Sequence, residues 1–405
     1  MVDMTKSSTK WFMLALMVAT NAFVASMPMS ALPVLFKEIS NDLGLSLVQI
    51  GSIWGAANLA GIFFSLLAGV MADRFGTRRT LIVFGFLTAL TGASRGLSDS
   101  FFMLVVTVFL NGAVRLVVPV AVTKNIGLWF RGERLGLAMG LSMMGMGIGL
   151  MLGPLVSASV LSPWLGGWRN VMYFLGGVAG LVSLFWLVMA REAPAPVEQE
   201  VGRVSILQSF RQLIHVRPIW ILGITLLFRT GCVMGVTGYM PLYLQDFLNW
   251  KPGLADGTLS AFYAVSAVLV VPLTFLSDRM GSRRKIMIPA LICSFIGTLL
   301  IPFADGALIW ILMMAQGMFQ DAFMSLVTTL VLETKGIKPE YFGTAIGMIF
   351  TLGLAGGVSG PPLGALFTRY SGSAPFYFWA GLALLALIVF SLAMAPRKTT
   401  LAPSV

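Results

Sequence analysis

Charged residues and histidine are scarce in this chain of 405 residues. Asp, Glu, Lys and Arg make up 11% of it, whereas soluble globular chains carry about 25%. The single histidine, His215, leaves little scope for histidine-based metal or acid–base chemistry, and no metal site is expected. Both cysteines, Cys232 and Cys293, lie in apolar runs, which excludes a disulfide scaffold. The chain has no G-x-x-x-x-G-K-[ST] phosphate loop, so nothing indicates ATP or another cofactor.

Long apolar runs dominate the chain instead. Apolar residues make up 57% of it, and the mean hydropathy is +0.89. A hydrocarbon core about 30 Å thick is crossed by a helix of roughly 20 apolar residues. The first run exceeds the apolar region of a signal peptide, so we expect it to be retained. The sequence predicts twelve membrane-spanning helices, at about residues 11–36, 46–72, 79–97, 100–124, 135–160, 170–190, 218–245, 257–277, 285–304, 306–332, 342–369 and 374–395.

A net charge of +11 accompanies this hydrophobicity. Twelve spans place both termini on one side, and 20 of the 27 Lys and Arg fall on that side. The loops opposite hold five basic residues, including Arg95, and six acidic residues, including Asp256. The positive-inside rule therefore predicts cytoplasmic termini and a bacterial-type inner membrane. The basic charge reflects orientation in a lipid bilayer, and nucleic-acid binding is excluded.

The two halves of the chain are related by a repeat. Residues 72–79, after the second predicted helix, match residues 277–284, after the eighth, and 132–140 match 339–347. Such repeats are typical of transporters built from two related bundles. We predict an all-α membrane protein with two pseudo-symmetric six-helix bundles, 1–190 and 218–405. Residues 191–217 are predicted to be a cytoplasmic linker with a short amphipathic helix, whose apolar face holds Ile206, Leu207, Phe210, Leu213 and Ile214.

The first repeated loop is Gly69-Val-Met-Ala-Asp73-Arg74-Phe-Gly76-Thr-Arg78-Arg79, and a weaker copy is Asp278-Arg279-Met-Gly281-Ser-Arg283-Arg284. It resembles the signature between helices 2 and 3 of the major facilitator superfamily, whose members are secondary transporters that work by alternating access. The resemblance implies that Asp73 latches against helix 11 and Asp278 against helix 5, closing the cytoplasmic side. Plain positive-inside loops are the alternative reading. The chain is similar in style to bacterial branches that move monocarboxylates and other small anions.

Glycines in the fifth predicted helix carry a second resemblance. Gly140, Gly149, Gly153 and Pro154 are similar to the superfamily's helix-5 signature, although Val156-Ser157 replaces its terminal glycine pair. Gly356, Gly360 and Pro361 repeat the pattern in helix 11. A four-residue spacing places small residues on one helix face and allows close approach of another helix. Because helices 5 and 11 meet the opposite half in the resembling fold, we expect a sliding seam there; close packing alone is the alternative.

Three charged residues are predicted inside the membrane, where each charge costs several kcal/mol. Arg115, Arg229 and Asp321 each lie about 14 to 16 Å from the end of their helix at 1.5 Å per residue. They belong to helices 4, 7 and 10, which with helix 1 line the central cavity of the resembling fold. Further candidates for the pocket are Asn21 and Gln320 at similar depth by the repeat, Asn111 one turn from Arg115, and Tyr263.

Two arginines and one aspartate leave a surplus positive charge in the membrane. The guanidinium fork suits bidentate binding of a carboxylate, so we predict a small anionic substrate, most simply a monocarboxylate or dicarboxylate. Asp321 is the candidate for proton coupling, with symport as the leading mechanism. A permanent ion pair between Asp321 and Arg115 or Arg229 is the alternative.

Two other functions compete with anion transport. The helix-5 signature also suits a proton-driven drug efflux antiporter, which would call for surplus acidic charge in the pocket. A non-transporting sensor or an anion channel on the same fold is the second rival. No enzymatic activity is expected, and the chain is predicted to work as a monomer.

Overall fold

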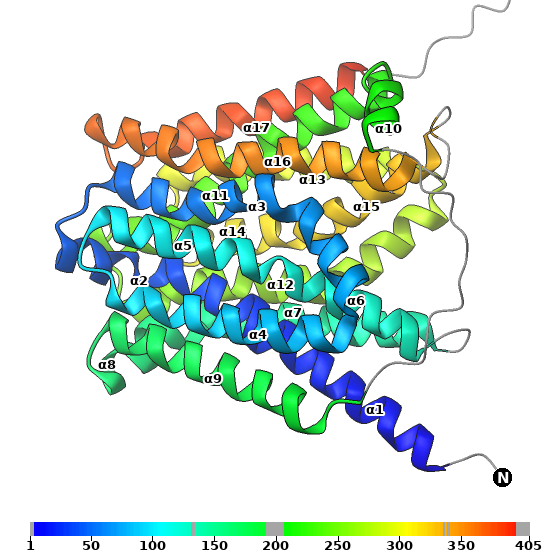
Figure 1. Ribbon diagram of the computed structural model, residues 1–405. Helices are drawn as coiled ribbons and strands as arrows, with labels where there is room; N and C mark the ends of the chain where they lie inside the picture. The colour runs from blue at the N-terminus through cyan, green and yellow to red at the C-terminus, as the bar shows by residue number, and fades with distance from the viewer. Residues whose placement is uncertain (1–3, 131–133, 192–205, 335–336, 338–340, 394–405) are drawn as a thin grey trace, which may run out of the picture.

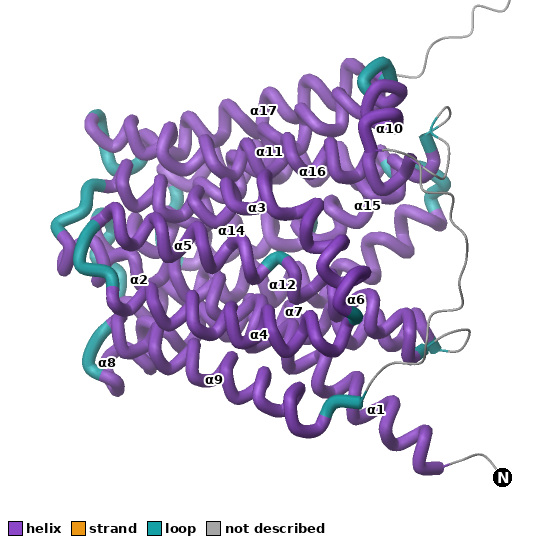
Figure 2. Tube along the Cα trace, in the orientation of Figure 1, coloured by secondary structure: helices purple, strands orange, loops and turns teal. Residues whose placement is uncertain are grey.

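The structure, a computed structural model, describes residues 4–130, 134–191, 206–334, 337 and 341–393, and every regular element in these ranges is helical (Figure 2). Twelve segments are long and apolar enough to cross a membrane, which confirms the prediction. The first half consists of α1 (Met4–Ala19), η1 (Thr20–Ser26), α2 (Met27–Leu43), α3 (Leu47–Phe75), α4 (Thr77–Ser94), η2 (Arg95–Leu97), α5 (Phe101–Arg115), α6 (Val117–Trp129), α7 (Leu135–Val156), η3 (Ser157–Leu161), α8 (Ser162–Leu165) and α9 (Trp168–Met189). After α10 (Ile206–Leu213), the second half consists of α11 (Arg217–Asp246), α12 (Pro252–Arg279), α13 (Arg284–Leu300), η4 (Ile301–Phe303), α14 (Ala307–Met318), α15 (Gln320–Glu333), α16 (Phe342–Ala365), η6 (Leu366–Arg369) and α17 (Ala374–Ala393).

Both ends of the described chain lie on one side of the bundle (Figure 1). There α1 begins, α10 packs on α16, and α17 ends; we call this the linker side, and the opposite one the far side. The predicted amphipathic helix is present as α10, with Leu213 buried and Phe210 exposed. Residues 192–205 of the linker lie outside the described part of the chain, so the limits predicted for the two halves stay a prediction.

Three of the spans are interrupted near their middle. The first contains the π-helix η1, the fourth breaks at Leu116 between α5 and α6, and the tenth breaks at Phe319 between α14 and α15. Interruptions inside a membrane free backbone groups, which neighbouring helices must then satisfy. Asn21, Arg115 and Asp321 lie at these three interruptions, so the polar residues coincide with the irregular backbone.

The two halves pack against each other from the middle of the membrane to the far side. The main contacts join α3 to α16, α7 to α12 and α2 to α11. On α3, a Cβ added at Gly51 would lie 2.9 Å from the backbone of Pro361, and one at Gly55 would lie 2.7 Å from the carbonyl oxygen of Val358. Because such distances leave no room for a methyl group, the backbones of α3 and α16 are in direct contact.

Polar contacts close the same region. Lys37 of α2 forms an ion pair of 2.8 Å with Asp246 of α11, and the Trp54 indole of α3 donates to the Met234 carbonyl of α11 at 3.0 Å. On the linker side, a Cβ added at Gly136 or Gly140 of α7, or at Gly343 of α16, would meet no atom within 4 Å. The halves are therefore sealed on the far side, and these glycines are free of contact on the linker side.

The four signature glycines of α7 and α16 pack inside their own halves, whereas their neighbours Gly147 and Gly357 face Ala267 and Asn58 of the opposite half. Gly149 faces the carbonyl oxygen of Ala22, and Gly356 faces that of Leu227 in α11, each too closely for a methyl group. Gly153 and Gly360 make equivalent contacts one turn along, with Ser30 and Gly231. The prediction of a seam between the halves is wrong for these four glycines, because a four-residue spacing defines a helix face without identifying its neighbour. Of the predicted set, Pro361 alone is seen to meet the opposite half.

Alanine at the packed glycines is expected to destabilise the protein. Gly149→Ala and Gly356→Ala each place a methyl group against a backbone carbonyl, at a cost of about 1–3 kcal/mol. Gly140→Ala is the matched control: its methyl group has free space, and it gains up to about 1 kcal/mol of helix propensity. Thermal unfolding in detergent measures the difference. Equal unfolding temperatures for all three variants would refute the packing described here.

Candidate functional site

Arg229 lies in the middle of α11 and is completely buried. Its guanidinium carbon lies 4.2 Å from the centre of the Phe323 ring of α15. None of its three side-chain nitrogens has a hydrogen-bond partner among the described residues. A buried charge without a partner is costly, and stacking on an aromatic face compensates only part of that cost. The five N–H donors of the arginine are therefore left without an acceptor from the described side chains and backbone.

A hydroxyl missed by the sequence analysis accompanies Arg229. Thr225 lies one turn earlier on the same face of α11, is buried, and its Oγ1 has no partner. Thr230, the residue after Arg229, also carries an unpartnered hydroxyl. The spacing of four residues between Thr225 and Arg229 is the signal that could have identified it from the sequence.

Asp321 lies in the first turn of α15, just after the interruption at Phe319. Its backbone amide donates to the Ser266 hydroxyl of α12 at 3.1 Å. The preceding residue, Gln320, has a side-chain oxygen without a partner. The start of a helix carries partial positive charge, which favours a carboxylate at this position. Tyr263 lies one turn before Ser266, is nearly buried, and packs edge-on against Phe262.

Arg115 occupies the equivalent place in the first half. It ends α5, where partial negative charge favours a cation, and it donates to the Ala25 carbonyl of η1 at 3.2 Å. The π-helical turn of η1 thus gains a partner from the fourth span. Asn21 of η1 donates to the Ser142 hydroxyl of α7 at 2.8 Å and retains an unpartnered side-chain oxygen.

Asn111 is turned away from the other polar residues. Its amide donates to the carbonyl of Thr88 and to the hydroxyl of Thr91, both on α4 and both at 3.1 Å. These bonds occupy both donors of the amide group. The structure thus assigns Asn111 to the packing of α5 on α4, which argues against the predicted contact with substrate.

The alternative of a permanent ion pair involving Asp321 finds no support. The described side chains form ion pairs between Lys37 and Asp246, Arg169 and Asp42, Arg283 and Asp278, and Arg283 and Glu333. Arg229 has no hydrogen-bond partner, and Arg115 bonds to a carbonyl. The three mid-membrane charges are thus not neutralised as pairs within the described part of the chain.

Two residues assigned to far-side loops are in fact buried. Arg95 folds inward from η2 and donates to the carbonyls of Gly92 and Pro28 at 3.0 and 3.1 Å. Asp256 is buried in the first turns of α12, which begins at Pro252, five residues before the predicted start. Proline is favoured at the first position of a helix, so Pro252 was the available signal for the earlier start.

The repeated loops are arranged differently from the latch that the resemblance implies. Gly76 and Gly281 adopt φ angles of 77° and 63°, which confirms the tight turns. The side chain of Asp278 is 63% exposed and pairs with Arg283 of its own loop, and Arg283 also binds Glu333 of α15 at 2.8 Å. Hydrogen bonds to Glu333, which has the largest effect, and to Asp278 raise the pKa of the Arg283 guanidinium. Asp278 therefore does not reach α7 in this conformation, because the halves are not joined there.

The remaining loop arginines bind the last helix of their own half or remain exposed. Arg78 donates to the Leu187 carbonyl of α9, and Arg284 to the Ser391 carbonyl of α17. Arg74 lies near the Phe75 ring, and Arg79 and Arg279 are exposed. The side chain of Asp73 and the surroundings of Gly69 lie outside the described part of the structure, so the first latch stays a prediction.

The chain matches the model of the family described as "Major Facilitator Superfamily" over residues 14–263 and 248–404. The chain belongs to the major facilitator superfamily. Among relatives of this superfamily member are the probable nitrate/nitrite antiporter NarK1 of Thermus thermophilus (28% identical, covering 88% of this chain and 85% of the relative) and the hexuronate transporter of Bacillus subtilis (24%, covering 88% of each). The multidrug resistance protein MdtG of Proteus mirabilis is 26% identical and covers 90% of each chain.

Solved superfamily structures share the fold. The crystal structure of the nucleoside transporter NupG superposes with a TM-score of 0.77 at 15% identity, covering 96% of this chain and all of that one. At this identity the likeness shows the fold alone. It confirms the predicted all-α architecture of two helical bundles.

Proposed function

We propose that this superfamily member is a secondary active transporter of a small anion, most simply a carboxylate. The observation that carries the proposal is the buried Arg229 guanidinium, which has no hydrogen-bond partner in the part of the chain that the structure describes. Stacking on Phe323 uses the flat face of the guanidinium and leaves the in-plane N–H groups for a planar oxyanion. Nitrate and nitrite, named for one relative, and hexuronate, named for another, are anions with such oxygens, which supports the class.

Neighbouring groups complete the proposed site. The Thr225 hydroxyl and the Gln320 amide are proposed to supply further hydrogen bonds. Arg115, Asn21 and Tyr263 are proposed to complete the wall of the pocket. Because Arg229 is buried, an anion reaches it only when the surrounding side chains separate. Substrate binding is thus tied to a change of conformation, as alternating access requires.

The far-side seal supplies the closed gate of this cycle. With the termini in the cytoplasm, as the positive-inside rule predicts, the structure corresponds to a state closed toward the outside. The opposite state would break the contacts of α3 with α16 and of α7 with α12, and would bring Asp73 and Asp278 to the other half. The protein is proposed to perform this cycle as a monomer in the inner membrane.

A disulfide across the seal is expected to stop transport. A Cβ at Gly253 of α12 would lie 3.6 Å from the Cβ of Ser159 in η3, which suits a disulfide between the halves. The double variant Gly253→Cys/Ser159→Cys should lose uptake to background on oxidation and recover it with a reductant. The matched controls are Gly253→Cys alone and Ser159→Cys alone, each with one introduced cysteine. Undiminished uptake by the oxidised double variant would contradict the proposed gate.

Uptake into proteoliposomes tests the proposed substrate class. A panel of labelled anions (a monocarboxylate, a dicarboxylate and nitrate) and a lipophilic cation are supplied with and without a pH gradient. We expect saturable uptake of at least one anion and none of the cation. Transport of the cation alone would refute the proposal.

Drug efflux is the second candidate, favoured by the similarity to MdtG. A pocket for cationic drugs calls for unpaired acidic groups. The three mid-membrane charged residues are instead two arginines, Arg115 and Arg229, and one aspartate, Asp321. The same panel of compounds separates the two functions.

A further inference from the structure

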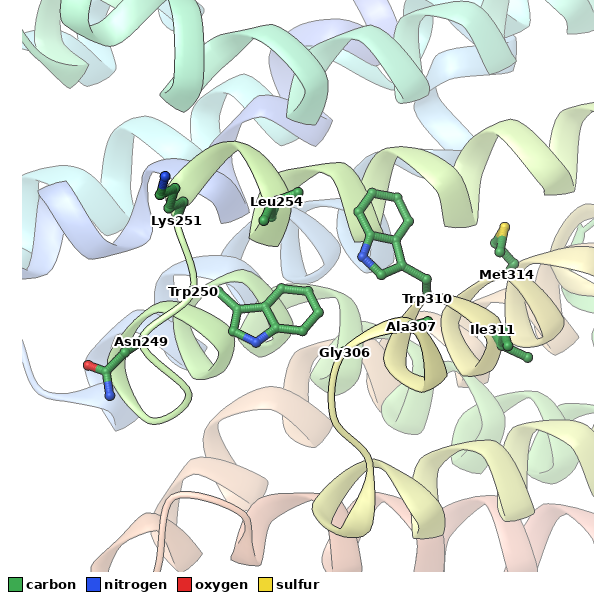
Figure 3. Close-up of a pocket in the computed structure, with 9 residues that line it drawn as sticks. All are labelled: Asn249, Trp250, Lys251, Leu254, Gly306, Ala307, Trp310, Ile311 and Met314. Carbon is green, nitrogen blue, oxygen red and sulfur yellow. The ribbon is translucent and has the colours of Figure 1, made fainter.

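A groove of about 720 Å³ opens on the far side, between the start of α12 and the start of α14 (Figure 3). Its walls include the indoles of Trp250 and Trp310, and Lys251 stands at its rim. Leu254, Ile311 and Met314 form its apolar part. It is separate from the mid-membrane charges, and neither the superfamily nor the proposed site accounts for it.

Neither indole N–H group has a hydrogen-bond acceptor among the described residues. The rings themselves are supported by packing contacts. A Cβ added at Gly257 of α12 would lie 2.6 Å from the Trp310 ring, so this glycine makes room for the indole. Trp250 follows Asn249, whose φ of 53° turns the chain sharply, and its backbone amide bonds to the Leu244 carbonyl at 2.9 Å. The Trp250 side chain packs against the hydrophobic core, so both indoles are supported by their surroundings.

The groove lies where the membrane surface is expected. Its two helices begin their spans at Pro252 and Ala307, so Trp250 and Lys251 stand at the boundary between headgroups and acyl chains. Tryptophan and lysine are favoured at that depth. Toward the membrane centre, Leu254 and Ile311 are 55% and 56% exposed, and Val268 on the same face of α12 is 69% exposed. The apolar end of the groove thus continues into a surface that faces lipid.

We propose that this groove binds one phospholipid of the far-side leaflet. The Lys251 ammonium would pair with the phosphate, the Trp250 and Trp310 indoles would flank the headgroup, and Leu254, Ile311 and Met314 would pack against an acyl chain. Lys251 forms none of the ion pairs found among the described residues, and the Asp305 carboxylate near the rim accepts the Gly306 amide of its own loop. The cationic rim and the apolar floor together match an amphiphile with a phosphate headgroup.

Native mass spectrometry of the full-length protein tests this site. The purified chain is titrated with phosphatidylglycerol and with a phosphate-free glycolipid carrying the same acyl chains. We expect one saturable phosphatidylglycerol in the wild type, about fivefold weaker binding in Lys251→Gln, and further loss in Trp250→Phe/Trp310→Phe. Arg369→Gln is the matched control, since Arg369 is a cation 4.7 Å from the Tyr370 ring but outside the groove. Wild-type affinity in all variants, or equal binding of the glycolipid, would overturn the proposal.

Discussion

Arg229→Met is expected to reduce anion uptake on the order of 100-fold while leaving the unfolding temperature unchanged or higher. Two hydrogen bonds between a guanidinium and an anion contribute about 3 kcal/mol, which corresponds to that loss. The described part of the fold loses no hydrogen bond, because none of its groups accepts from Arg229. Replacing a buried charge with an apolar side chain of similar length is often neutral or stabilising. Initial uptake rates and thermal unfolding of the purified variant measure the two effects.

Arg95 is the matched control for this experiment. It is equally buried, but it donates to the carbonyls of Gly92 and Pro28. Arg95→Met removes both of these hydrogen bonds, so we expect a loss of about 1–3 kcal/mol of stability with an unchanged KM for the anion. If Arg229→Met loses stability and keeps its KM, Arg229 is a structural residue and the assignment fails.

Asp321→Asn is expected to abolish proton-driven accumulation while preserving exchange of internal for external anion. One coupled proton and a gradient of about one pH unit support about tenfold accumulation, and an amide cannot carry the proton. The predicted accumulation ratio therefore falls from about ten to one. Asp256→Asn is the matched control, since Asp256 is a buried carboxylate of the same half that lies outside the mid-membrane group. Tenfold accumulation of anion by Asp321→Asn would show that Asp321 does not carry the coupled proton.

The spans and the two-bundle fold were predictable because membrane insertion depends on composition over some 20 residues. The three mid-membrane charges stood out for the same reason, since a charge there is conspicuous in any apolar run. Side-chain direction was not predictable in this way. Asn111 faces α4, and Gly149 faces the first span, although each lies in the membrane-spanning helix that the sequence predicts.

The remaining differences depend on conformation and on helix ends. The latch prediction for Asp278 concerns a contact between halves that are apart on the linker side, and a repeat in the sequence does not specify which state is populated. Arg95 and Asp256 were assigned to loops because hydropathy places helix ends within a few residues only. The interruption at Leu116 does have a signal in the sequence, because Pro119 has no N–H to bond to the Arg115 carbonyl four residues earlier. The interruption at Phe319 follows Gly317 and has no such proline.

Equilibrium binding of a labelled anion to the purified protein tests the central claim most directly. The wild type and Arg229→Met are compared in detergent, with unlabelled anion as competitor. We predict saturable binding of the anion to the wild type, and binding about 100-fold weaker in the variant. Equal affinity in the two proteins would contradict the role of Arg229 as the anion-binding residue.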